Sequence, residues 1–147
     1  MCHLFNLVVE EALQQFPVYV LQFVKKICAY FNTSQRSSKL REIQLNAGIK
    51  EPLEVFASKI VSWESLFNCI ERILKLWPDI KLRLDETDSF LKGDINDPEY
   101  ELYGYLLYVF LHKLTRYIVT FQKSNLLFEQ VIDKMREIFF FPTNKCY

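Results

Sequence analysis

The sequence has 147 residues, a length that suits one domain of ordinary size. Half of the residues are hydrophobic and 16% are aromatic, which supplies a core and argues against an intrinsically disordered chain. Lys and Arg together number 18, as do Asp and Glu, so there is no global basic field to hold nucleic acid or an anionic membrane surface.

The small number of turn formers favours helices. Only three Gly and five Pro are present, fewer than a β-sandwich or an α/β fold normally needs for its tight turns. The four cysteines lie at positions 2, 28, 69 and 146, without C-x-x-C or zinc-ligand spacing. This pattern indicates free thiols in a reducing compartment.

Neither a signal peptide nor a membrane helix is predicted. The N-terminus shows no basic region and no small-residue cleavage site. The longest apolar run, 102–111, is about half of the roughly 20 residues that cross a bilayer. We therefore expect an intracellular protein, not a secreted one, with no membrane partner.

Helical spacing begins at the N-terminus. A first helix is predicted over 3–15, and a second begins at Pro17, because proline is tolerated at the first helical position. Residues 32–38 are a cluster of polar turn formers. A short helix is predicted over 38–45, and residues 52–60 are weakly helical in pattern.

The strongest helical pattern follows Ser62, a natural N-cap. From Trp63 to Trp77, seven apolar residues recur at spacings of three and four, which places them on one helix face. Pro78 disfavours helical geometry at Trp77 and so predicts an end or a kink there.

Residues 85–101 carry seven carboxylates against one lysine. We expect a loop, or a short helix with a loop, and residues 85–97 are the best candidate for a hinge. The carboxylates lack the order of a calcium-binding loop, so a solvated acidic loop is favoured over a cation site.

Asp97-Pro98-Glu99 predicts a helix start, with a cap, a proline and a carboxylate near the positive end of the helix dipole. This helix runs to about Gln122 and is apolar nearly all round, which predicts packing on several sides. A last helix begins at Ser124. The expected fold is an all-α array of six or seven helices in a single domain over residues 1–147.

Motifs for enzymatic chemistry are missing. There is no Gly-rich phosphate loop and no G-x-S-x-G serine, and two histidines are poor material for a catalytic triad. The Cys2-His3 pair would need further ligands, and His112 is the other histidine, so no metal site is predicted. We expect no catalytic residue, no cofactor and no small-molecule substrate.

A mild basic patch follows the second predicted helix, formed by Arg36, Lys39, Arg41 and Lys50. It can contact phosphates or can be a solvated face.

Periodicity places both tryptophans, Trp63 and Trp77, on the apolar face of their helix, which favours core packing. Trp63 lies in the first turn, however, where a ring can protrude and stack on a base.

The N-terminal segment carries a family resemblance. CHLFNLVV, residues 2–9, resembles the C-x-x-H-x-L-N-L segment of hAT-family transposases. The histidine half of that motif is present as His3, Leu4, Asn6 and Leu7, and the family cysteine would fall just before Met1.

Three later segments follow in the family's order. Residues 24–42 resemble the next block, in which a helix ends in Phe, a polar turn and an Arg/Ser/Lys-rich helix start. Residues 61–78 resemble the Thr-Arg-Trp block, with Trp63 as the family tryptophan. Residues 117–138 resemble a later helical pair around a Phe-Gln-Ser-like turn.

The resemblance implies a definite ancestry. The family's transposases have an RNase H-like core with a metal-dependent Asp-Asp-Glu triad, interrupted by a large helical insertion. Their tryptophan works near the active site on flipped or hairpin DNA, a role that the resemblance assigns to Trp63. The triad aspartates would lie upstream of His3 and the glutamate beyond the insertion, and the arginine before the tryptophan is Ser62 here.

The sequence therefore resembles the helical insertion without the catalytic sheet. The leading hypothesis is a catalytically incomplete transposase remnant that associates weakly with DNA through Trp63, Arg36, Lys39 and Arg41; the resemblance also implies a nuclear location, with the cytoplasm as the alternative. A second hypothesis is an interaction domain whose apolar helix faces pair with a protein partner or a second copy. A third is a gene-model fragment with no function of its own.

Overall fold

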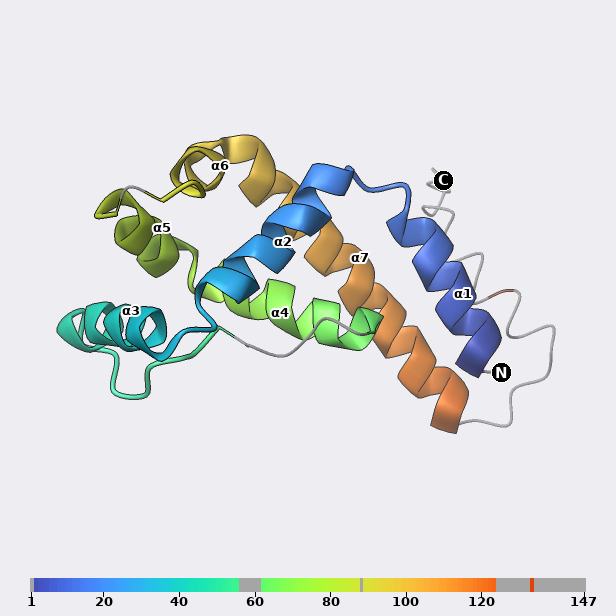
Figure 1. Cartoon of the computed structure of the whole chain (residues 1–147). Helices are drawn as coiled ribbons and strands as arrows, with labels where there is room; N and C mark the ends of the chain where they lie inside the picture. The colour runs from blue at the N-terminus through green and yellow to red at the C-terminus, as the bar shows by residue number, and fades with distance from the viewer. Residues whose placement is uncertain (1, 56–61, 88, 124–132, 134–147) are drawn as a thin grey trace, which may run out of the picture. The chain divides into compact units, whose positions relative to one another are not determined.

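The computed structural model describes the backbone of residues 2–55, 62–87, 89–123 and 133, and that part of the chain contains helices and no strand (Figure 1). Side chains are described for residues 7, 9–55, 62–87, 89–116 and 133. The helices are α1 (Cys2–Leu13), α2 (Val18–Tyr30), α3 (Ser34–Asn46), α4 (Trp63–Lys75), α5 (Trp77–Asp85), α6 (Lys92–Asn96) and α7 (Pro98–Lys123). The predicted all-α fold is confirmed.

The chain divides into two compact units, Met1–Tyr108 and Val109–Tyr147. The first unit contains α1 to α6 and the beginning of α7, and the second contains the remainder of α7. The division lies inside α7, whereas the segment proposed as a hinge, 85–97, lies within the first unit. The last predicted helix, from Ser124, falls outside the described residues.

Helix α4 begins where its sequence predicts. The Ser62 hydroxyl accepts a hydrogen bond from the Ser65 backbone N–H at 3.2 Å, and the Ser65 hydroxyl accepts one from the Ser62 N–H at 3.1 Å. This reciprocal pair is a capping box that satisfies donors at the helix start. At the other end, Trp77 and Pro78 open α5, so the predicted end or kink is a change of helix.

The core of the first unit forms around α4, which packs against α1, α2 and α5. Its buried side chains are Leu66, Cys69, Ile70 and Ile73, and those of the facing helix α2 include Phe23, Val24, Ile27 and Cys28. The thiols of Cys28 and Cys69 are free and hydrogen-bond to each other, and burial raises the pKa of both. For these two cysteines, the prediction of free thiols is confirmed.

The beginning of α7 closes on this pair of helices. A Cβ atom at Gly104 would lie 3.2 Å from Leu74 Cδ2, so the missing side chain allows a close approach to α4. The rings of Phe67 and Tyr108 stack with centroids 5.5 Å apart, and those of Phe23 and Tyr100 meet edge to face at 4.9 Å. Aromatic contacts therefore position the first turns of α7 on both α2 and α4.

Two predictions in the middle of the chain are wrong. Residues 34–38, expected as a polar turn, are already helical, because Thr33 is the N-cap of α3 and its carbonyl accepts the first helical hydrogen bonds. Residues 52–55 are not helical, because the N–H and carbonyl of Leu53 hydrogen-bond to the side chain of Gln44. A polar core contact outside the local pattern overrides the weak helical signal.

For residues 98–116 of α7, whose side chains are described, the expectation of packing on several sides is also wrong. Leu102, Tyr105 and Leu106 are about half exposed although they lie within the most apolar stretch of the chain. Apolar composition alone does not show which face of a helix is covered.

Among the described residues, no helix has the length and apolar character that a bilayer crossing requires.

Candidate nucleic-acid interface

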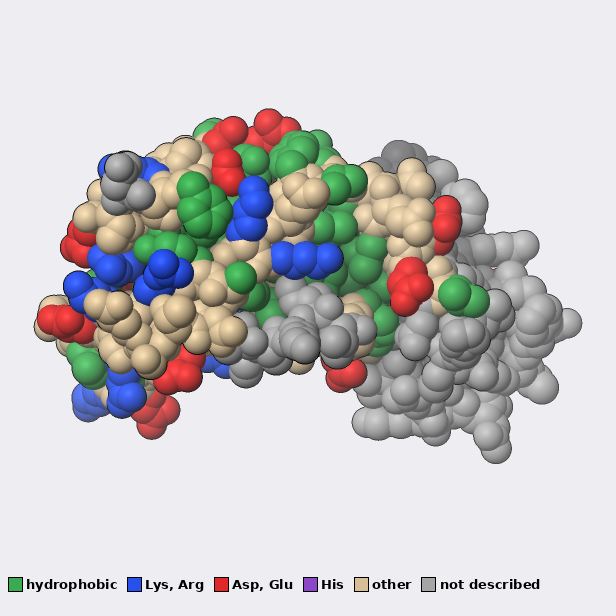
Figure 2. Space-filling model, viewed as in Figure 1, with side chains coloured by type: hydrophobic (Ala, Val, Ile, Leu, Met, Phe, Trp, Pro, Cys, Tyr) green, Lys and Arg blue, Asp and Glu red, His purple; other side chains and the backbone are tan. Residues whose placement is uncertain are grey.

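Beyond its first turn, the outer face of α2 carries two lysines and no carboxylate. Gln22, Lys25, Lys26 and Ala29 are exposed at helical spacing, while the opposite face of α2 is buried in the core. The helix contains no Asp or Glu. We call these four residues the α2 strip; in Figure 2, Lys and Arg side chains lie over α2 and around α3.

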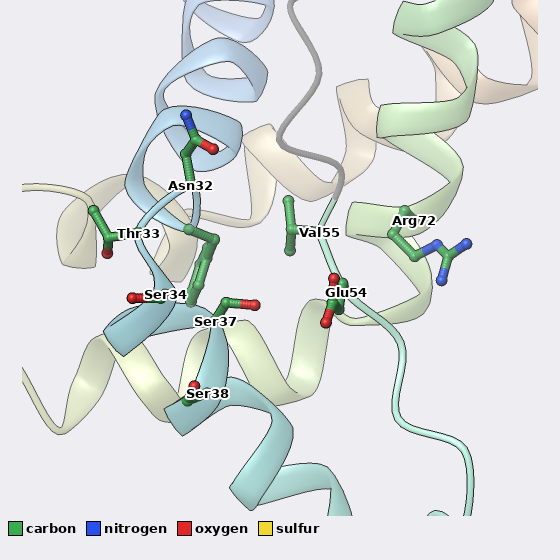
Figure 3. A pocket seen from close by; sticks show the side chains of 9 residues that line it. Asn32, Thr33, Ser34, Ser37, Ser38, Glu54, Val55 and Arg72 are labelled. Atoms are coloured by element: carbon green, nitrogen blue, oxygen red, sulfur yellow. The ribbon is translucent and has the colours of Figure 1, made fainter.

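The α2 strip leads to a hollow at the junction of α2 and α3 (Figure 3). The hollow has a volume of about 460 Å³. Its lining is formed by Phe31, Asn32, Thr33, Ser34, Ser37, Ser38, Glu54, Val55 and Arg72. The exposed Asn32 and Thr33 continue the outer face of α2 into this hollow.

The chemistry of the hollow is mainly that of neutral hydroxyl and amide groups. Such groups, together with the first N–H groups of a helix, are among the common contacts to phosphate and sugar oxygens. One carboxylate, Glu54, and one guanidinium, Arg72, also line it. In Figure 3 the guanidinium of Arg72 extends away from α3, so the hollow does not concentrate positive charge as an arginine cluster would.

One wall of the hollow is fixed by the buried side chain of Gln44. Its Oε1 accepts a hydrogen bond from the Leu53 N–H at 2.7 Å, and its Nε2 donates to the Leu53 carbonyl at 2.8 Å. Holding Leu53 in this way positions the next two residues, Glu54 and Val55, on the lining. This role could not be predicted from the sequence, because a single buried Gln in a polar helix has the same local pattern as a solvated one.

Of the predicted basic patch, Arg36, Lys39 and Arg41 lie on α3 but do not share one face, and Lys50 is exposed beyond the end of that helix. Arg36 stacks over the Tyr30 ring at 4.1 Å and donates from Nη1 to the Tyr30 carbonyl at 3.2 Å, so it braces the α2–α3 junction. Lys39 and Arg41 are exposed. Two residues apart, they point about 200° from each other and flank α3 on opposite sides.

Trp63 and Arg72 lie near opposite ends of α4. Nine residues separate them, which corresponds to about 13 Å along the helix axis. Trp63 is half-buried in the first turn, whereas Trp77 is buried, as a structural role predicts. The hollow and Trp63 are therefore separate places on the first unit.

The other predicted site residues are His3 and Asn6. Both belong to the backbone of α1, and their side chains lie outside the described residues. In the part of the chain that is described, no three His, Cys, Asp or Glu side chains come together in a way that could hold a metal ion.

Sequence reasoning missed Lys25 and Lys26 as site residues. Their signal was available, because two adjacent lysines lie between the apolar pairs Phe23-Val24 and Ile27-Cys28. That arrangement places the lysines on the outer face of a helix whose inner face is apolar.

Replacement of Gln44 by Ala should lower the free energy of unfolding by about 1–3 kcal/mol, because the Leu53 N–H and carbonyl lose their partners. Urea unfolding followed by circular dichroism measures this. Gln35→Ala is the matched control on the same helix, at an exposed position, and should change stability by less than about 0.5 kcal/mol. Equal effects of the two substitutions would contradict the role assigned to Gln44.

The family model of the ZBED1 RNase-like helical domain matches residues 1–102. The matched region is 102 of 147 residues and contains α1 to α6, the α2 strip, the hollow and Trp63. Neither a curated protein nor a solved structure matches this chain.

Proposed function

The chain belongs to the family of ZBED1 RNase-like helical domains, and from this premise we propose that it is a DNA-associated, catalytically incomplete remnant of a hAT-like transposase. The family match supports a helical domain related to hAT transposases. The hAT-like segment order at 2–9, 24–42 and 61–78 lies within the matched residues and supports the finer assignment.

The proposal includes the absence of strand cleavage. In the family that the chain resembles, the catalytic carboxylates lie outside the helical insertion, so the proposal assigns no step of strand cleavage to the helical domain itself. What remains for the helical domain is to hold DNA or to hold another protein chain.

The observation that carries DNA association is the α2 strip. Lys25 and Lys26 lie side by side on a helix without carboxylates, and the same face leads into a hollow rich in hydroxyl groups. Lysines supply phosphate contacts that are independent of sequence, and hydroxyl and amide groups fix the backbone of the nucleic acid. With so few cations, binding is weak, sensitive to salt and without sequence preference.

Trp63 supplies a second contact in this proposal. It lies at the far end of α4, about 13 Å from the position of Arg72, and its ring is not fully enclosed by the core. An unpaired base can stack on such a ring, whereas a paired base remains in the duplex. Trp63 therefore favours single-stranded or distorted DNA over regular duplex.

Removing the two strip lysines should weaken DNA binding and its dependence on salt. For the double variant Lys25→Gln and Lys26→Gln, the slope of log K against log salt should decrease in magnitude by about 2, because two phosphate contacts are lost. Fluorescence anisotropy with a labelled oligonucleotide, repeated over a series of salt concentrations, measures the slope.

The matched control removes two exposed lysines outside the strip, Lys81 on α5 and Lys92 on α6. Lys81→Gln and Lys92→Gln change the net charge by the same amount and should leave the slope nearly unchanged. A further control, Glu42→Gln on α3, removes a negative charge and should not weaken binding. Equal losses in the strip variant and in the lysine control would mean that net charge, and not the α2 strip, determines binding.

Trp63→Ala should weaken binding to single-stranded DNA by about 1–3 kcal/mol and affect duplex binding less, because base stacking is lost. Trp63→Phe keeps an aromatic face and should retain most of the affinity. Thermal melts of both variants separate loss of stacking from loss of folding. An unchanged affinity of a folded Trp63→Ala variant for single strands would remove Trp63 from the interface.

A further inference from the structure

The hollow at the α2–α3 junction has the size of a small-molecule site and two sides of different chemistry. Its volume of about 460 Å³ lies within the range of about 300–1,000 Å³ that is typical of such sites. One side presents hydroxyl groups from the start of α3, and the other presents the Glu54 carboxylate. In Figure 3 the Ser37 hydroxyl points toward Glu54. A group bound between them would donate a hydrogen bond to the carboxylate.

The polar side chains of the hollow are not engaged with one another. Thr33 is the N-cap of α3, yet its side chain makes no capping hydrogen bond. Within the described part of the chain, no hydrogen bond engages the Glu54 carboxylate or the Ser37 hydroxyl. The backbone before Glu54 is nevertheless fixed, because Gln44 holds Leu53 through two hydrogen bonds. These groups can therefore bind a ligand without first breaking internal contacts, which lowers the cost of binding.

The α2 strip gives the hollow a cationic approach. Lys25 and Asn32 are seven residues apart, so they share one helix face and lie about 10 Å from each other along the helix axis. Ala29 lies between them, and its small exposed side chain leaves the path open. A nucleic-acid strand that follows this path meets lysines first and the Glu54 carboxylate at the end. The lysines attract phosphates, whereas Glu54 repels them.

This order of charges favours the end of a strand over its interior. An internal nucleotide has a phosphate on each side, so filling the hollow with it would bring one phosphate toward Glu54. A terminal nucleotide with a free hydroxyl has a phosphate on one side only. Its phosphate can face the α2 strip while its hydroxyl faces Glu54.

We propose that the hollow binds the terminal nucleoside of a DNA strand whose end carries a free hydroxyl. The terminal hydroxyl donates a hydrogen bond to Glu54, and the Ser37 hydroxyl donates one to a sugar oxygen. The last phosphate of the strand lies toward Lys25 and Lys26. Because the sugar end is recognised, binding is independent of base sequence. This inference rests on the DNA association proposed above. Both the 3′ and the 5′ hydroxyl have this chemistry, and the experiment separates them.

Competition binding with single-stranded oligonucleotides of one sequence tests the proposal. The strands carry a hydroxyl or a phosphate at the 3′ end and at the 5′ end, and the fluorescent reporter strand is labelled at an internal base. A hydroxyl at the recognised end should bind about threefold to tenfold more tightly than a phosphate there, the range of one net hydrogen bond. Non-specific attraction alone would favour the strand with the extra phosphate, so the expected preference has the opposite sign.

Glu54→Gln should abolish this preference, because it keeps the size of the side chain and removes its charge. Glu51→Gln is the matched control, since Glu51 is exposed in the same segment after α3, and it should keep the preference. Each variant is judged by the ratio of its affinities for the two kinds of end. This ratio cancels the general gain in affinity that follows the loss of a negative charge. Circular dichroism confirms folding of both variants.

The outcomes separate this inference from the proposed function. DNA binding with equal affinity for hydroxyl and phosphate ends, or with a preference for phosphate, would overturn the assignment of the hollow and leave DNA association intact. Absence of binding to every strand would overturn both. An equal loss of preference in Glu54→Gln and Glu51→Gln would also overturn the assignment, because net charge and not the carboxylate in the hollow would then determine the preference.

Discussion

The packing of α2 against α4 is the contact on which the rest of the first unit depends. Ile27 and Ile70 are completely buried, and the thiols of Cys28 and Cys69 meet between the two helices. Because α4 also packs against α1 and α5, loss of its apolar face would release three neighbours at once. The outer face of α2 is presented to solvent only because its inner face is held on α4, so the same contact that builds the core also orients Lys25 and Lys26.

The hollow and the exposed side of α7 are separate consequences of this core. The hollow exists because α3 turns away after Phe31, while Gln44 returns Leu53 and its neighbours to face Ser37. Gly104 and the aromatic contacts of Tyr100 and Tyr108 draw one side of the first turns of α7 onto α2 and α4, and the side chains on its other side remain exposed. The same core that closes the first unit therefore presents the α2 strip and the hollow on its surface.

Local signals predicted the elements whose causes are local. Neighbouring residues determine the Ser62 cap, the apolar face of α4 and the Asp97-Pro98 start of α7. The structure confirms all three predictions. The structural role of Gln44 could not be recognised, because it depends on hydrogen bonds to the Leu53 backbone, which only tertiary folding brings close. The basic residues of α3 were recognised by type, and the two-residue spacing of Lys39 and Arg41 on a helix is enough to place them on opposite flanks. The exposed side of α7 was missed because its apolar sequence does not show which side the neighbouring helices cover.

Native-state alkylation of Cys28 and Cys69 over a urea series, resolved by peptide mass spectrometry and compared with circular dichroism, tests the central claim most directly. Burial and a raised pKa should keep both thiols unreactive in the folded protein. If the α2–α4 contact holds the first unit together, their reactivity and the loss of helical signal should share one midpoint. Thiols that react well before the helical signal falls would contradict the account, because α2 and α4 would then separate while the other helices remained folded.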